Sequence, residues 1–235
     1  MSVKQVNINI NFDFRDDVTN GKDPDIHSEK LREYHKTLWS KPLPSGVTFS
    51  LTDSVKGKYL YHQSSLGEFS LSSDSISHSY IFLKRFEKIT SKLNQKQKNE
   101  ILRKFSTIGG YIIFPSNKID NKITINGARG FLRTIIDRFD LTLECIRRYY
   151  LGLDSPLYET LMRYEDFFTL FDNFRGYVDY FLLQDLVSSN YEEINFFSDF
   201  DDSFPANPFP KNFNDYCNFI ENIKIFVTKR GLRMI

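Results

Sequence analysis

The stretch TINGARGFLRTIIDRFDLTLECIRRYY, residues 124–150, carries the strongest helical pattern of the chain and decides the fold class. Its apolar side chains recur at spacings of three and four residues, which places them on one face of a helix. The members of this face are Phe131, Leu132, Ile135, Ile136, Phe139, Leu143, Ile146 and Tyr150. The spacing predicts one long amphipathic helix that begins near Arg129 and ends before Gly152 and Pro156.

The start of this helix is a candidate anion site. Asn126 is a good N-cap residue, and Gly127 permits backbone geometry that a Cβ atom would forbid. The free N–H groups of a helix start attract phosphate or carboxylate, and Arg129 adds a forked donor. These residues predict a phosphate-binding site, although the motif is neither a P-loop nor a dinucleotide fingerprint. A capped helix start without a ligand is the alternative.

The polar side of the same helix is a candidate catalytic site. Its predicted members are Arg133, Asp137, Asp140, Glu144 and Arg148. Carboxylates at spacings of three and four raise one another's pKa or attract a cation. In the functional interpretation Asp137 or Glu144 acts as a base, while Arg147 and Arg148 hold phosphates. The alternative is a lattice of ion pairs that faces solvent.

The order of the predicted elements favours an α+β fold, in which N-terminal antiparallel strands precede a mainly helical half around one core. Alternation and short apolar runs predict strands at residues 6–14, 47–51, 59–62, 69–71, 111–114 and 123–125. Helical spacing predicts further helices at residues 27–39, 80–93, 95–105, 157–171, 176–187 and 213–228. Neither an internal repeat nor a linker interrupts the chain, so residues 1–235 are predicted to form a single domain.

Composition narrows the class of protein. The aromatic fraction is 16%, with 23 Phe and 13 Tyr, which indicates an aromatic-rich core. A stacking surface for bases is the alternative, and it requires exposed aromatics beside Lys and Arg. The net charge of +1 gives no global field that selects nucleic acid or an anionic membrane, but it leaves a local basic patch open. The Lys- and Gln-rich residues 94–104 read as a solvated helix face.

The remaining polar groups predict little ligand chemistry. Cys145 and Cys217 have no metal-type spacing, and Cys145 is expected to be a reduced thiol in the core. We expect no metal and no cofactor. Residues 1–11 lack an apolar signal segment, and no apolar run spans a bilayer, so the chain is expected to be cytoplasmic and not membrane-bound. The acidic residues 199–202 read as a solvated loop that also contains Phe200.

His62 is a further candidate catalytic residue, because it lies at the end of a predicted strand. The alternative is a histidine that hydrogen-bonds a neighbouring loop. Residues 59–62, YLYH, followed by Ser-rich strands, also loosely resemble the nucleotide-binding strand of ADP-ribosyltransferases, although no Glu pairing completes that pattern.

Several longer motifs resemble a bacterial protein family that has no assigned function. They are WSKPLP at 39–44, GEFSLSSD at 67–74, GGYIIFP at 109–115, INGARG at 125–130, DRFDLTLECIRRYY at 137–150 and GYVDYFLLQDL at 176–186. The resemblance covers most of the chain. It implies a bacterial or phage origin and a single domain, and it assigns no mechanism.

Two classes of function follow from these features. The first is a small intracellular bacterial or phage enzyme of the toxin or phage-defence type that acts on nucleic acid or a nucleotide, for instance by metal-independent RNA cleavage. The second is a non-catalytic protein-binding or inhibitor protein that uses Phe196, Phe197, Phe200, Phe204 and Phe209 as an aromatic anchor. ADP-ribosyl transfer is a weaker alternative within the enzyme class.

Overall fold

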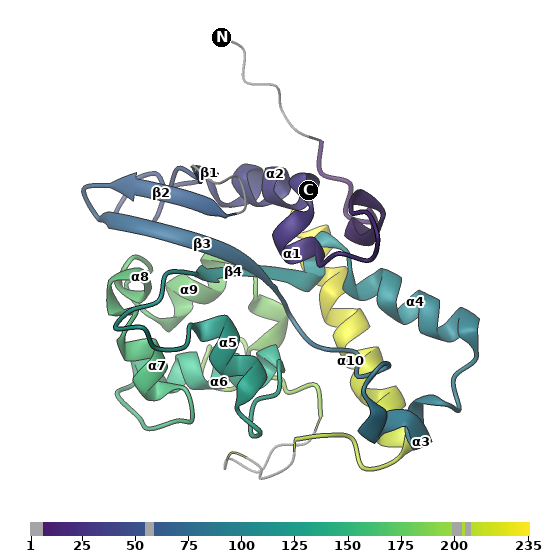
Figure 1. The fold of residues 1–235 in the computed structure, drawn as a ribbon. Coiled ribbons are helices and arrows are strands. Elements are labelled where there is room, and N and C mark those ends of the chain that lie inside the picture. The colour runs from purple at the N-terminus through teal and green to yellow at the C-terminus, as the bar shows by residue number, and fades with distance from the viewer. Residues whose placement is uncertain (1–6, 55–58, 199–203, 205–207) are drawn as a thin grey trace.

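A four-stranded antiparallel sheet lies in the N-terminal half of the chain (Figure 1). The computed structural model describes residues 7–54, 59–198, 204 and 208–235. The strands lie in chain order: β1 (Thr52–Asp53), β2 (Leu60–Ser64), β3 (Gly67–Ser75) and β4 (Tyr111–Pro115). The helices lie mostly in the second half, which confirms the predicted α+β fold.

The sheet is built from one tight hairpin and one buried strand. Gly67 has a φ of +133°, a conformation that suits glycine, and it opens β3 opposite Ser64 at the end of β2. Ser73 of β3 pairs with Ile113 of β4. Every residue of β4 is buried, because helices cover one face of this strand and the N-terminal segment covers the other (Figure 1). The apolar run at 111–114 therefore predicted this strand correctly.

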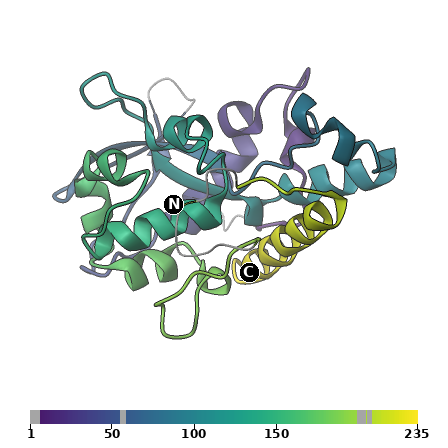
Figure 2. The same cartoon turned by 90° about the horizontal axis from the view of Figure 1, so that it is seen from below.

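Helices enclose the sheet on both sides. Figure 1 shows α1 and α2 on one side, α5 to α9 on the other, and α4 beside α10 at one end; Figure 2 shows α6 and α10 along the lower surface. The α-helices are α1 (Pro24–His27), α2 (Glu29–Trp39), α3 (Glu87–Thr90), α4 (Gln95–Phe105), α5 (Ile125–Phe131), α6 (Phe139–Tyr150), α7 (Tyr158–Met162), α8 (Glu165–Thr169), α9 (Phe174–Tyr180) and α10 (Phe213–Leu232). The 3-10 helices are η1 (Phe14–Asp17), η2 (Lys84–Phe86), η3 (Ile108–Gly110) and η4 (Gln184–Leu186).

The long helix predicted from Arg129 is wrong. α5 ends at Phe131 and α6 begins only at Phe139. Between them Ile136 and Asp137 adopt left-handed conformations, with φ of 46° and 54°, which a helix cannot contain. The chain folds back there, and Asp137 donates its backbone N–H to the carbonyl of Arg129.

The helical spacing survives this break only in part: Ile125 and Ala128 of α5 are buried, whereas Phe131, predicted for the apolar face, is 79% exposed. Ile135, Phe139, Leu143 and Ile146 are all fully buried. The hydrophobic periodicity of a sequence indicates which side chains are buried, but it does not reveal a turn between two helices that pack on the same core.

Several shorter predictions are also wrong. No strand forms over residues 7–14, where Phe14 begins η1, and residues 47–51 hold only an isolated bridge. Ile125 opens α5 and not a strand. The helix expected over 80–93 is reduced to η2 and α3, and the helix expected over 157–171 splits into α7 and α8. α9 stops at Tyr180, because Leu182 adopts a left-handed conformation with φ of 57°.

The core is rich in aromatic side chains, as the composition predicted. Phe171 lies 5.0–5.3 Å, between ring centroids, from each of Tyr177, Tyr180 and Phe181. Trp39 contacts Phe181 edge to face at 5.3 Å. One cluster of buried side chains runs from Phe14 to Met234. Within the described part of the chain, none of the helices combines the length and the apolar character needed to span a bilayer.

Candidate functional site

The start of α5 does not have the geometry expected from the sequence. Thr124 is the N-cap, and its hydroxyl accepts from the Gly127 N–H at 3.3 Å. Asn126 lies in the first turn and donates to the Ser72 hydroxyl at 3.0 Å and to the Ser73 carbonyl at 3.3 Å. Ile123 packs over this turn, since a Cβ on Gly127 would lie 2.7 Å from its side chain. The start of α5 is therefore partly covered by Ile123, and the Gly127 N–H is already bonded to the Thr124 hydroxyl.

Arg129 is fully buried, and its guanidinium is held by protein groups. It forms an ion pair with Asp74, donates from Nε to the Thr142 hydroxyl at 3.0 Å and from Nη2 to the Ser75 carbonyl at 3.1 Å. Its Cζ also lies 5.5 Å from the centre of the Phe114 ring. Arg129 thus joins α5 to β3 and α6, and these donors point into the protein.

Two carboxyl groups that interact electrostatically with this arginine, those of Asp74 and Asp25, have raised pKa values. Burial raises the pKa of Asp74 to about 6 against the opposing effect of Arg129, and Asp137 raises it further. Burial also raises the pKa of Asp25, on α1, well above its usual range, helped by repulsion from Asp74 and Asp23. The Oδ1 atom of Asp25 is buried and accepts no hydrogen bond from any described residue. We call Asp25, Asp74, Arg129 and Asp137 the Arg129 cluster.

Glu144 forms a separate ion-pair group on α6. Its carboxylate accepts from Arg147 Nε at 2.7 Å and from Arg148 Nε at 2.7 Å. Glu144 is buried, whereas each arginine is about one-fifth exposed. The turn at Asp137 separates this group from the Arg129 cluster, so the expected single polar arc does not exist.

Two further charged residues of the predicted polar face, Asp140 and Arg133, also lie outside the Arg129 cluster. Asp140 is fully buried, where it pairs with Arg138 and accepts from the Phe197 N–H at 2.8 Å. Arg133 lies exposed in the segment between α5 and α6.

His62 has the geometry of a structural histidine that hydrogen-bonds neighbouring protein groups, which was the alternative to a catalytic role. Its side chain is buried, with Nδ1 at 2.9 Å from the Ser50 carbonyl and Nε2 at 2.9 Å from the Ser64 hydroxyl. The ring lies between Phe49 and Phe69, at centroid distances of 4.2 and 6.1 Å. Both ring nitrogens are engaged by neighbouring protein groups, so this geometry gives the ADP-ribosyltransferase alternative no support.

The aromatic anchor expected around residues 196–209 is not an exposed patch where the structure describes it. Phe197 is buried, and Phe196, Phe204 and Phe209 pack partly buried against the core. Phe200 and the acidic residues 199–202 lie outside the described residues.

The buried thiol of Cys145 and the arrangement of potential metal ligands bear on two of the predictions. Cys145 is buried, and burial raises the pKa of its thiol to about 12, as expected for a core cysteine. Among the described residues no group of His, Cys, Asp and Glu side chains is arranged to hold a metal ion.

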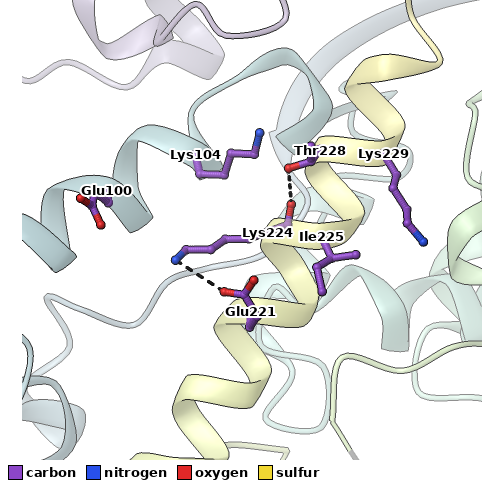
Figure 3. A pocket seen from close by; sticks show the side chains of 7 residues that line it. All are labelled: Glu100, Lys104, Glu221, Lys224, Ile225, Thr228 and Lys229. Carbon is purple, nitrogen blue, oxygen red and sulfur yellow. Dashed lines mark hydrogen bonds and ion pairs between the residues drawn. The ribbon is translucent and has the colours of Figure 1, made fainter.

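A surface groove that the sequence did not single out lies between α4 and α10 (Figure 3). Its volume is about 490 Å³, and the lining residues are Glu100, Lys104, Glu221, Lys224, Ile225, Thr228 and Lys229. Lys224 points from α10 toward α4 and lies 3.7 Å from Glu221, whose side chain is 63% exposed (Figure 3). The groove is therefore open to solvent and carries three lysines.

The segment that contains α3 and α4, next to the groove, is the most basic of the chain. Residues 84–104 contain eight basic residues and only two acidic ones, Glu87 and Glu100. The basic members are Lys84, Arg85, Lys88, Lys92, Lys96, Lys98, Arg103 and Lys104, and each is exposed or half-buried. Figure 1 places α3, α4 and α10 together at one end of the molecule. We call this region, with the groove, the basic face.

Only part of the basic face was visible in the sequence. The run 94–104 predicts a solvated helix face, and α4 does form there, with Asn94 as its N-cap in a reciprocal capping box with Gln97. The lysines of α10 follow more than 100 residues later, and the fold alone brings them beside α4.

Comparison with known proteins places the chain in a family but assigns no activity. The model of a family of unknown function, DUF6994, matches residues 8–234, which confirms the expected relationship to an uncharacterised family. No curated protein and no solved structure matches the chain. The match covers nearly the whole sequence, so the chain belongs to this family of unknown function.

Proposed function

We propose that the chain binds nucleic acid, and that the basic face of α3, α4 and α10 contacts the phosphate backbone. The observation that supports this proposal is the charge at that end of the molecule, eight basic residues against two acidic ones over residues 84–104. The rest of the chain is net acidic, since the total charge is only +1. Such an asymmetry orients a polyanion toward one face.

The groove gives this face a shape as well as a charge. Lys104 and Lys224 come from two different helices, and the Ile225 side chain, 45% exposed, lies between lysines of α10. The 3.7 Å pair of Lys224 with Glu221 is exposed and contributes little, so a phosphate can replace the carboxylate. Lysines contact phosphates while an apolar side chain meets a sugar or a base, as in grooves that track one strand.

The enzyme hypothesis extends this binding proposal. A toxin or phage-defence role, RNA as the substrate and a cytoplasmic location remain predictions. The expected catalytic groups have protein partners: Glu144 binds Arg147 and Arg148, and both nitrogens of His62 are engaged. Binding is thus the part of the hypothesis that the surface supports.

A charge-reversal experiment tests the proposal. Fluorescence anisotropy at low salt would measure the affinity of a labelled single-stranded RNA and of a DNA duplex. The double variant Lys224→Glu and Lys229→Glu is compared with Lys118→Glu and Lys122→Glu, which lie exposed in the loop before α5 and change the net charge equally. We expect the α10 variant to lose about tenfold or more in affinity and the loop variant to lose much less. Equal losses, or no binding by the parent chain, would overturn the proposal.

A further inference from the structure

An exposed phenylalanine lies at the start of the basic segment. Phe82 precedes Lys84 by two residues, and its side chain is 77% exposed, although the neighbouring Ile81 is buried. Lys84 and Arg85, which follow, are both exposed. A stacking surface for bases requires an exposed aromatic ring beside Lys and Arg, and Phe82 meets this requirement.

The backbone that carries Phe82 is anchored on both sides. Tyr80 adopts a left-handed conformation with φ of 59°, and its carbonyl accepts from the Leu83 N–H at 3.1 Å, which closes a turn that contains Phe82. The Tyr80 hydroxyl donates to the Ile136 carbonyl at 3.0 Å. On the other side, the Phe86 N–H donates to the Leu83 carbonyl at 2.8 Å. The exposed ring is therefore presented from a held turn, which lowers the entropy cost of a contact with a ligand.

Aromatic packing attaches this turn to α10, close to the groove. The Tyr80 and Phe219 rings are stacked, with 5.6 Å between their centroids and 8° between their planes. Phe219 lies on α10 two residues before Glu221, which lines the groove, and two residues correspond to about 3 Å along a helix axis. Figure 1 shows the segment between β3 and α3 running beside α10. The turn that carries Phe82 and the groove thus contact adjacent parts of α10.

Cations that have no carboxylate partner lie on the same stretch. Arg85 Cζ lies 3.8 Å from the centre of the Phe209 ring, and Lys92 Nζ lies 5.5 Å from that of Phe213, the first residue of α10. Both basic side chains are exposed. Among the residues that the structure describes, no acidic side chain forms an ion pair with either of them. A phosphate can therefore approach these cations without displacing a protein carboxylate.

We propose that Phe82 stacks against an unpaired base, so that the basic face binds a single strand of nucleic acid in preference to a duplex. The inference rests on the proposed nucleic-acid binding and adds the class of substrate. In a duplex both faces of a base are covered by neighbouring base pairs, whereas an unpaired base offers a free face to an aromatic ring. Lys84 and Arg85, beside the ring, contact the phosphates that flank the stacked base. Because every base has such a face, the contact selects for strandedness and not for sequence.

Substitution of two equally exposed phenylalanines tests the inference. Phe131, at the end of α5, is 79% exposed and lies outside the basic segment, so Phe131→Ala is the matched control for Phe82→Ala. Fluorescence anisotropy compares a labelled RNA strand of mixed sequence with a DNA duplex of equal charge. We expect the parent chain to prefer the single strand, and Phe82→Ala to lose about tenfold or more in affinity for it while duplex affinity changes little. Phe82→Trp should restore single-strand binding, and Phe131→Ala should leave both affinities unchanged.

The salt dependence separates this inference from the proposed function. Phe82→Ala removes a stacking contact and no phosphate contact, so its affinity should fall equally at every salt concentration, with an unchanged slope of log affinity against log salt concentration. If the parent chain binds but Phe82→Ala binds the single strand as tightly, or loses strand and duplex affinity equally, the stacking inference is overturned and the binding proposal stands. If the parent chain binds neither nucleic acid, both are overturned.

Discussion

Arg129 and Asp74 form a buried ion pair that joins α5 to β3. The arginine is fully buried and the side chain of Asp74 is 16% exposed. The sequence predicted that Arg129 binds the phosphate of a ligand, whereas in the fold Arg129 pairs with the carboxylate of Asp74. The charge is neutralised within the protein, and this pair anchors the region where the predicted long helix breaks.

Removal of Arg129 is expected to destabilise the fold strongly. Arg129→Met leaves Asp74 buried without its cation, which costs about 3–5 kcal/mol of unfolding free energy. The matched control is Arg233→Met, since Arg233 pairs with Asp185 at the surface, where a pair contributes about 1 kcal/mol or less. Urea denaturation measures both variants. Similar small losses for both would contradict the structural role of the Arg129 cluster.

The raised pKa values in the Arg129 cluster predict the direction in which stability depends on pH. Asp74 and Asp25 hold their protons more tightly in the folded chain than in the unfolded chain. Their stabilising contribution is therefore complete below about pH 4 and is lost as the pH rises through the folded pKa, which for Asp74 is about 6. Asp25→Asn removes one of these groups, so the variant should gain stability over the parent between pH 4 and pH 8.

Urea unfolding over that pH range checks this prediction. Asp166→Asn, an exposed position on α8, is the control and should follow the parent curve. A parent-to-variant difference that stays constant from pH 4 to pH 8 would show that Asp25 does not titrate as expected.

Replacement of glycine by alanine is expected to have opposite effects on stability at Gly109 and Gly231. A Cβ on Gly109 would lie 2.2 Å from the backbone carbonyl oxygen of Val227, so η3 and α10 could not keep their close approach. We expect Gly109→Ala to cost about 3 kcal/mol or more. Gly231 lies within α10, and its nearest neighbour would be 3.6 Å away, an ordinary contact. Gly231→Ala should instead stabilise the helix by up to about 1 kcal/mol. Thermal or urea unfolding distinguishes these outcomes, and equal effects would contradict the packing of α10 on η3.

The sequence predicted those elements whose signals are local. α4 carries its own capping box at Asn94, β4 is a short apolar run, and α10 has an N-cap at Asn212. The break between α5 and α6 is not local, because Ile136 and Asp137 are ordinary residues in left-handed conformations, where the Ile136 carbonyl accepts from the Tyr80 hydroxyl and the Asp137 N–H donates to the Arg129 carbonyl. Propensity cannot indicate such a turn.

The candidate sites were predictable to different degrees for the same reason. The charges of residues 84–104 can be counted in the sequence, but their neighbours on α10 depend on the fold. Burial of Arg129 and His62 likewise depends on which elements cover them.

The salt dependence of RNA affinity tests the central claim most directly. The slope of log affinity against log salt concentration counts the phosphates that the protein neutralises. For the double variant Lys224→Glu and Lys229→Glu we predict a slope shallower by about 2 than that of the parent chain, because each lysine accounts for about one phosphate. The loop variant Lys118→Glu and Lys122→Glu should keep the parent slope. An unchanged slope in the α10 variant would show that RNA does not contact the basic face, and it would contradict the proposed function.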